Sequence, residues 1–259
     1  MEGKIDVKDL EVRYAPDLDP VLKGLTFTVN AKEKVGVVGR TGSGKSTLAL
    51  SFFRFVEPTE GHILIDGIDI CQIGTQDLRS NLTIIPQDPV LFSGTLRSNL
   101  DPFQEFDEES IMAALKRVEL LPSDEDVDVP EQGDGHSRED LLLTSNVFTD
   151  LESPVSEGGQ NFSQGQRQLI CLARALLKRS RIVLMDEATA SVDFETDEAI
   201  QKTIASEFAD CTILCIAHRL RTVIEYDKIL VLDQGEIAEF ASPLDLLNTP
   251  NSTFNKMCE

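Results

Sequence analysis

The chain has 259 residues, of which 41% are hydrophobic and 27% charged, as expected for a globular protein with one large domain or two small ones. Its formal net charge of −21 argues against nucleic-acid binding, because phosphate backbones are held by clustered Lys and Arg. No apolar run approaches the ~20 residues that span a bilayer, and no secretory signal is visible. We therefore expect a soluble, cytosol-facing chain or a soluble part of a larger protein.

The N-terminal part of the sequence predicts β-strands. Apolar and polar residues alternate from Ile5 to Val12 and from Leu25 to Val29, as in half-buried strands. Further short strands are expected at 34–39, 62–67 and 83–87. The first of these runs into a Gly-rich segment and then into a helix that starts near Lys45.

The middle of the chain predicts a helix followed by an acidic insertion. Apolar residues recur on one face over 107–120, and the acidic residues at its start suit the positive end of the helix dipole. Residues 122–153 include a strongly acidic run with prolines and glycines and no apolar period, so we expect a solvated loop or a locally disordered segment. Ser123 precedes three acidic residues, which leaves regulatory phosphorylation as an alternative to an inert loop.

Strands and helices alternate after Ser163. A helix follows Ser163, and the later elements are expected as strands at 181–187, 212–218 and 228–233, with a helix at about 195–208 and a short helix after the second strand. This alternation implies a mainly parallel sheet covered on both faces. The five scattered cysteines form no Cys-x-x-Cys pair, and the histidines near them lack metal-ligand spacing, so reduced thiols are expected.

The strongest motif is GRTGSGKS, from Gly39 to Ser46, which matches the phosphate-loop pattern. It follows a predicted strand and opens a predicted helix, as the motif requires. Its glycines let backbone N–H groups curl around phosphate oxygens. Lys45 supplies positive charge to the outer phosphates, and Ser46 offers a hydroxyl to Mg²⁺.

Other candidate residues lie at predicted strand ends. The run IVLMDE ends in Asp186, placed to bind Mg²⁺ through water, and Glu187, placed to act as a general base on an attacking water. Gln87 and His218 each end a predicted strand, and Tyr14 could stack on a purine. Taken alone, Gln87 is better explained by a turn, His218 by a structural histidine and Tyr14 by an ordinary strand aromatic.

The stretch NFSQGQRQ, at 161–168, is small, polar and opens a helix. A helix start of this kind is suited to an anion, because its N–H groups are free and the helix dipole is positive there. The chain would thus contain two anion-binding helix starts more than a hundred residues apart.

The order of these motifs resembles that of nucleotide-binding domains of ATP-binding-cassette (ABC) transporters, and the resemblance covers almost the whole chain. The segments 14–27, 84–103 and 165–177 are similar to the second nucleotide-binding domain of C-subfamily, multidrug-resistance-associated exporters. The acidic insertion resembles that of fungal vacuolar members. The implied fold is α/β: a P-loop core with a parallel sheet, an N-terminal antiparallel β subdomain and an α-helical subdomain at about 88–178, all in one domain over 1–259.

The resemblance implies ATP and Mg²⁺ as ligands. Glu187, His218 and Gln87 would be catalytic, and Ser46, Gln87 and Asp186 would form the metal shell. The implied nucleotide-binding residues are Tyr14, Gly39, Thr41, Gly42, Ser43, Gly44, Lys45, Ser46 and Thr47.

In this family two such domains stack head to tail, with each ATP between one phosphate loop and the signature of the other domain. The signature here would comprise Ser163, Gln164, Gly165 and Gln166, and Asp193 would lie in the D-loop. The family's common signature has Gly where this chain has Gln164, whose side chain should hinder close approach to phosphate. We therefore expect an intact hydrolytic site on this chain's own phosphate loop and a degenerate signature.

The implied function is ATP hydrolysis that drives export, with the first nucleotide-binding domain and transmembrane domains of the same transporter as partners. The domain would lie on the cytosolic face of a vacuolar or plasma membrane. An alternative is an ATP-sensing domain that gates a channel. Soluble cassette proteins acting in translation or on DNA are disfavoured by the charge of −21.

Overall fold

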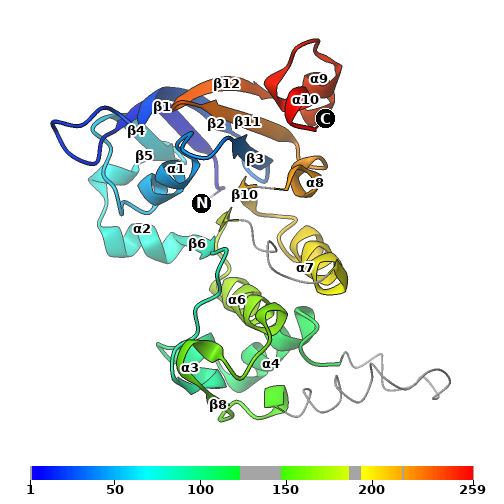
Figure 1. Cartoon of the computed structure of the whole chain (residues 1–259). Coiled ribbons are helices and arrows are strands. Elements are labelled where there is room, and N and C mark those ends of the chain that lie inside the picture. Colours follow the sequence, from blue (N-terminus) through cyan, green and yellow to red (C-terminus); the bar gives the residue numbers. More distant parts are fainter. Residues whose placement is uncertain (1, 123–146, 187–193, 218, 259) are drawn as a thin grey trace. The chain divides into compact units, whose positions relative to one another are not determined.

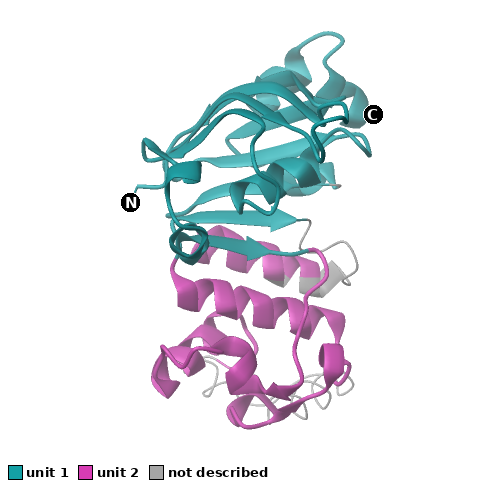
Figure 2. Cartoon of the chain, turned by 90° about the vertical axis from the view of Figure 1, so that its left-hand side faces the viewer, with its two compact units in different colours: residues 1–86, 180–190, 209–259 teal, residues 87–179, 191–208 magenta. Residues whose placement is uncertain are grey.

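The computed structural model describes residues 2–122, 147–186, 194–217 and 219–258. The chain divides into two compact units, shown in different colours in Figure 2. Unit 1 comprises residues 1–86, 180–190 and 209–259, and unit 2 comprises residues 87–179 and 191–208. Within the described residues, no helix is both long and apolar enough to span a bilayer. Residues 123–146 of the predicted loop, with Ser123, lie outside the described residues. At the described end of 122–153 the prediction of a solvated loop is wrong, because Phe148, Leu151 and Ser153 are buried.

Unit 1 contains a six-stranded sheet in the order β12-β11-β3-β10-β9-β6. Its inner strands are runs of buried Val, Ile and Leu, the pattern of strands that are covered on both faces. All neighbours are parallel except the edge pair β11 and β12. The strands are β3 (Lys34–Gly39), β6 (Leu82–Ile85), β9 (Ile182–Asp186), β10 (Thr212–Ile216), β11 (Lys228–Asp233) and β12 (Glu236–Ala241). The carboxyl ends of β3, β9 and β10 therefore meet at one edge of the sheet.

A second, antiparallel sheet of unit 1 has the order β2-β1-β4-β5. Its strands are β1 (Ile5–Val12), β2 (Leu22–Val29), β4 (Glu60–Ile65) and β5 (Ile68–Asp69), seen in blue and cyan in Figure 1. The register between β1 and β4 shifts between Lys8 and Glu11. Gly61 lies at this bulge with φ +75, and a Cβ there would approach Asp9 O to 2.2 Å, so this position requires glycine.

One hydrophobic core joins both sheets to helix α1 (Lys45–Phe52). Leu48 and Phe52 of α1 are buried with residues of β1 and β2 on one side and of β3 and β9 on the other. The helix that follows the phosphate loop is thus held between two sheets. Short helices complete the unit: η1 (Ile70–Gln72), α2 (Thr75–Asn81), α8 (Leu220–Val223), α9 (Pro243–Asn248) and α10 (Thr253–Cys258).

Unit 2 is mainly helical. Its helices are α3 (Leu96–Leu100), α4 (Glu108–Arg117), α6 (Gln164–Lys178) and α7 (Phe194–Glu207), with a short 3-10 turn, η3 (Glu157–Gly159). A two-stranded ladder joins β7 (Gly94–Thr95) to β8 (Pro154–Val155). Helix α6 buries one face against α4, and the Arg117 side chain forms an ion pair with Glu207 of α7.

The predicted α/β fold with a parallel sheet and an N-terminal antiparallel part is confirmed. The strands at 5–12, 34–39 and 228–233 have the predicted bounds, and the other predicted elements differ by one to three residues at their ends. Strand β6 stops at Ile85, where Pro86 removes the backbone donor needed to extend the ladder. Strand β12 and helices α9 and α10 were not predicted.

The turn between β4 and β5 anchors the chain's N-terminal segment through one carboxylate. Asp66 accepts hydrogen bonds from the backbone N–H groups of Glu2 (2.8 Å), Gly3 (3.0 Å) and Lys4 (2.8 Å). Burial alone would raise the pKa of Asp66, but the bonds from Gly3, Lys4 and Glu2 outweigh it and lower the pKa below its usual value. The charged carboxylate therefore stabilises the folded state.

We predict that Asp66→Asn lowers the free energy of unfolding by about 1–2 kcal/mol at neutral pH, since the amide cannot accept all of these bonds. Asn tolerates the positive φ of this position, so the change in unfolding free energy reflects the loss of the charge and not backbone strain. Because the folded-state pKa is lowered, the deficit in unfolding free energy is full above the unfolded pKa of Asp and is lost as pH falls from there through the folded pKa. Urea unfolding at several pH values measures this.

Asp9→Asn is the matched control, because Asp9 also has positive φ but accepts only a hydroxyl bond from Thr26. If Asp66→Asn lowers the free energy of unfolding by the same amount at pH 3 and pH 7, the role given to the carboxylate is contradicted.

Candidate active site

The phosphate loop between β3 and α1 depends on close backbone packing. Gly39 and Gly44 have φ values of +156 and +104. A Cβ on Gly39 would lie 2.3 Å from Leu232 O, and one on Gly44 would lie 2.6 Å from Leu22 Cδ2. Gly42 also has positive φ, but a Cβ there would meet nothing within 4 Å. Two glycines thus fit the loop to its surroundings, while Gly42 lies in an open stretch of backbone that a ligand can approach.

The loop surrounds one cation and one unpartnered hydroxyl. Lys45 is buried, and its Nζ donates to Gly39 O at 2.7 Å and Arg40 O at 3.1 Å. Ser43 is also buried, and its Oγ has no hydrogen-bond partner among the described residues. An unpaired buried hydroxyl costs free energy unless a ligand supplies the bond. These features fit a site for a polyanion such as the phosphates of a nucleotide.

Tyr14 lies beside this helix start. It follows β1 by two residues, and its hydroxyl is 3.0 Å from Thr47 Oγ1 on α1. The residue is nevertheless 54% exposed. The hydroxyl bond therefore holds the ring next to the phosphate-loop helix while leaving aromatic surface accessible for stacking on a base.

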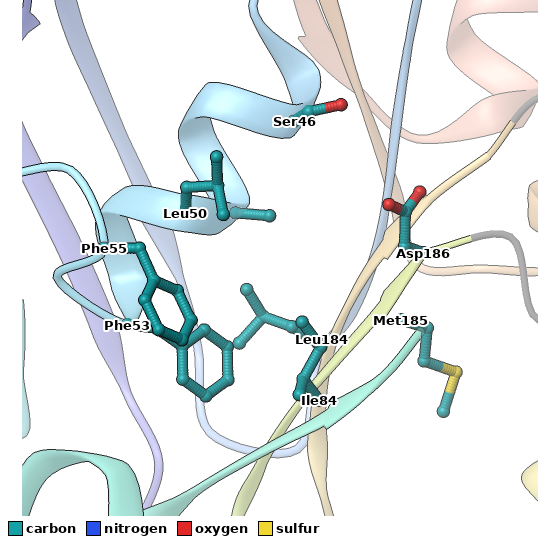
Figure 3. Close-up of a pocket in the computed structure, with 9 residues that line it drawn as sticks. Ser46, Leu50, Phe53, Phe55, Ile84, Leu184, Met185 and Asp186 are labelled. Carbon is teal, nitrogen blue, oxygen red and sulfur yellow. The ribbon is translucent and has the colours of Figure 1, made fainter. Parts of the chain in front are cut away.

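Ser46 and Asp186 border one pocket of about 120 Å³. Figure 3 shows the Ser46 hydroxyl and the Asp186 carboxylate at one end of this pocket, with Phe53, Ile84 and Leu184 at the other. Ser46 is the second residue of α1, and Asp186 ends β9. A hydroxyl, a carboxylate and phosphate oxygens are the ligands that Mg²⁺ commonly takes in nucleotide sites.

Among the described residues no group of three or more His, Cys, Asp or Glu could hold a metal ion by itself. At the pocket, Ser46 and Asp186 offer oxygen ligands that phosphate oxygens of a bound nucleotide could complement. This donor set fits Mg²⁺ bound together with a nucleotide.

The predicted signature forms the start of α6 as a complete capping box. Gln166 N donates to Ser163 Oγ at 3.1 Å, and Ser163 N donates to Gln166 Oε1 at 2.9 Å. The Ser163 hydroxyl accepts in this arrangement, so its own proton is free to donate. The backbone N–H groups of Gln164 and Gly165 lie in the first turn and have no intrahelical acceptor.

The predicted site residues fall into three groups. Tyr14, the phosphate-loop residues from Gly39 to Thr47, and Asp186 belong to unit 1. Gln87 is exposed and is the first residue of unit 2, which also contains the signature. Glu187, Asp193 and His218 lie outside the described residues.

Sequence reasoning missed the support that a distant turn gives to the phosphate loop. Gly235, between β11 and β12, donates its N–H to Ser43 O at 3.1 Å and accepts from Lys23 N at 2.9 Å. A Cβ on Gly235 would lie 2.2 Å from Val21 O. The glycine after Asp233 and Gln234 is a turn signal that could have indicated this hairpin, but its contact with the phosphate loop is a tertiary feature.

Comparison with known proteins places this geometry in a family. The sequence matches the family described as ABC transporter over residues 22–190. It is 54% identical over its whole length to the ATP-dependent bile acid permease of Saccharomyces cerevisiae, of which it spans 16%. Over 95% of its length it is 50% identical to ATP-binding cassette sub-family C member 3 of Rattus norvegicus, of which it spans 15%. A solved bacterial Atm1-family ABC exporter with ATP bound aligns with TM-score 0.82 and 34% identity, over 99% of this chain and 42% of that one.

The chain therefore belongs to the ABC transporter family, as a nucleotide-binding domain. Within that family its sequence is close to transporters of the C subfamily.

Tyr14→Phe and Tyr14→Ala test how the ring is used. We predict that Tyr14→Ala weakens ATP binding about tenfold, because a base–aromatic stack contributes about 1–3 kcal/mol. Tyr14→Phe keeps the ring and loses only the bond to Thr47, so its loss should be about threefold or less. Fluorescent-nucleotide titration measures both, and equal losses in the two variants would refute stacking.

Proposed function

We propose that this domain binds and hydrolyses Mg²⁺-ATP to drive substrate transport, as the second nucleotide-binding domain of a C-subfamily exporter. The observation that supports this most directly is the phosphate loop, where a buried Lys45 and an unpartnered Ser43 hydroxyl lie beside the accessible ring of Tyr14. Ser46 and Asp186 supply oxygen ligands in the same unit.

Each residue has a defined task in the proposed reaction. Tyr14 stacks on the adenine, the loop N–H groups and Lys45 bind the phosphates, and Ser46 and Asp186 hold Mg²⁺ together with Gln87. When bound, this ion would supply positive charge against the charge that develops on the phosphate oxygens. Glu187 removes a proton from the attacking water.

His218 contacts the γ-phosphate and senses its loss. His218 follows β10 by two residues, and β10 lies between β3 and β9 in the parallel sheet. The order of strands is therefore consistent with a γ-phosphate contact from the loop after β10.

The signature acts on a nucleotide held by a partner domain. The free N–H groups of Gln164 and Gly165, the positive helix end and the Ser163 proton all favour a phosphate. In this proposal the partner is the first nucleotide-binding domain of the same transporter, in an ATP-dependent head-to-tail dimer. Gln164 makes this chain's signature the weaker of the two, so the chain's own phosphate loop forms the hydrolytic site.

The whole transporter would also contain transmembrane domains. The chain spans about 16% of the length of the yeast permease, so most of such a protein lies outside this sequence. We propose that the domain is attached to the cytosolic face of a membrane, vacuolar or plasma, and that Asp193 lies in the D-loop of the dimer. A channel-gating role is less favoured, because the relatives are described as a permease, transporters and an exporter.

We predict that the chain alone hydrolyses ATP slowly and that its rate rises at least about tenfold when the first nucleotide-binding domain of the same transporter is added. Hydrolysis at the intact phosphate loop needs a signature from a second domain, and in a pair of identical chains that signature would contain the hindering Gln164. ATPase rate against protein concentration, with and without the partner domain, measures this.

Glu187→Gln is the control, because it should bind ATP with unchanged affinity and lose the stimulated rate. Equal turnover in this variant would refute the general-base role of Glu187. A rate that rises steeply with the concentration of the chain alone would refute the weak signature.

Gln164→Gly tests the signature directly. The change removes the side chain that hinders the approach of a phosphate, and position N1 of a helix tolerates Gly at a small cost. We predict that the ATPase rate of the chain alone becomes strongly concentration-dependent and rises several-fold, about fivefold or more. Gln160→Gly, just outside the helix, is the matched control, and an unchanged rate for Gln164→Gly would contradict the proposal.

A further inference from the structure

The ring of Tyr14 is carried by a loop, residues 13–20, that lies between β1 and β2. The structure describes all of these residues, and none of them is buried. Tyr14 is 54% exposed and Leu18 is 52% exposed, although both side chains are large and mainly apolar. Apolar burial therefore does not fix this loop, and its conformation depends on hydrogen bonds.

Backbone hydrogen bonds hold the two ends of the loop. Val21 N donates to Val12 O at 2.8 Å, which closes the loop where it leaves the antiparallel sheet. Arg13 N donates to Thr59 Oγ1 at 2.9 Å, and Thr59 N donates to Glu11 O at 2.7 Å. The residue immediately before the ring is thus fixed to the segment that leads into β4.

The Arg13 guanidinium holds the middle of the loop. Its Nη1 donates to Leu18 O at 3.0 Å, and its Nε donates to Glu11 Oε1 at 2.8 Å. The planar guanidinium makes both bonds at once because its N–H groups point in fixed directions. Glu11 therefore sets the orientation of the guanidinium, and the guanidinium fixes a carbonyl five residues further along the chain.

The Tyr14 ring is held from two sides. Its hydroxyl is 3.0 Å from Thr47 Oγ1 on α1, which fixes the far end of the ring. Leu18 N donates to Ala15 O at 3.1 Å, so the turn that Arg13 holds follows the ring directly. Without the Arg13 bond, the ring would remain tethered through its hydroxyl, but on a loop whose middle can move.

We propose that Arg13 is a positioning residue, which holds loop 13–20 so that the Tyr14 ring is already in place to stack on the base of a nucleotide. This inference rests on the proposed function and deepens it. A ring that occupies its binding position for a fraction of the time lowers the apparent affinity by that fraction. The loss of Arg13 should therefore weaken recognition of the base and leave recognition of the phosphates unchanged.

The test compares two ligands of the full chain by calorimetry: Mg²⁺-ATP and Mg²⁺-tripolyphosphate, which has the phosphates without the base. For Arg13→Met we expect the Kd for Mg²⁺-ATP to rise about fivefold, as it would if the ring were in place about a fifth of the time. The Kd for Mg²⁺-tripolyphosphate should stay the same, because the phosphate loop is not altered.

A double-mutant cycle shows whether Arg13 acts through the ring. In Tyr14→Ala there is no ring to place, so the addition of Arg13→Met should raise the Kd for Mg²⁺-ATP no further.

Tyrosine fluorescence anisotropy gives a second readout in the nucleotide-free chain. The chain has no Trp and 2 Tyr, and subtraction of the Tyr14→Phe signal isolates the emission of Tyr14. Arg13→Met should lower this anisotropy, because the loop gains motion on the nanosecond timescale.

Two variants accompany Arg13→Met. Arg13→Lys keeps the charge, but one ammonium cannot reproduce both bonds of the guanidinium, so its Kd for Mg²⁺-ATP should be intermediate. This variant tests the same claim if Arg13→Met folds poorly. Arg181→Met is the matched control and should bind both ligands normally, because Arg181 is an exposed residue of unit 1 whose side chain makes no hydrogen bond or ion pair within the described part of the chain.

The outcomes separate this inference from the proposed function. If Arg13→Met and Arg13→Lys bind Mg²⁺-ATP like the unchanged chain, or bind both ligands equally more weakly, the role of Arg13 is overturned and ATP binding stands. Additive effects of Arg13→Met and Tyr14→Ala lead to the same conclusion. If the unchanged chain does not bind Mg²⁺-ATP, or Tyr14→Ala binds it equally well, the proposed function of the ring and this inference fail together.

Discussion

The close packing of three backbone segments around the phosphate loop is the constraint on which the candidate site depends. Gly39 lies against Leu232 O, and Gly44 lies against the side chain of Leu22. Gly235 binds the loop at Ser43. These contacts join strand β3 to the start of β2 and to the turn after β11, so the loop keeps its shape through tertiary packing as well as through its own glycines.

Much of the fold follows from local patterns. The run KVGVVG predicts β3 with its observed bounds because a strand buried on both faces needs continuous apolar residues. Strand β12 escaped prediction because its residues are only partly buried and its alternation is weak. Helix α9 was missed although its signals are present, with Ser242 as the cap and Pro243 in the first turn.

Local sequence patterns single out candidate residues of the site but not the contacts between them. The motif identifies Lys45 and Ser46, because phosphate binding requires those groups at that spacing. The bond from Tyr14 to Thr47 crosses from one sheet to a helix, and the bonds of Arg174 to Val90 and Asn99 connect residues 75 or more apart. Such pairs depend on how elements pack, which no local pattern determines. From the sequence alone, Arg174 would be interpreted as a charged residue on the solvent-facing side of a helix.

The capping box at the signature has a consequence for the energetics of association. Ser163 and Gln166 already satisfy one another, so the helix start has its final backbone conformation in the separate chain. A loop that had to become ordered on contact would lose conformational entropy at that moment, whereas this helix start loses little. In the proposed head-to-tail dimer, the free energy gained from contact with a phosphate would therefore not be offset by the ordering of this helix start.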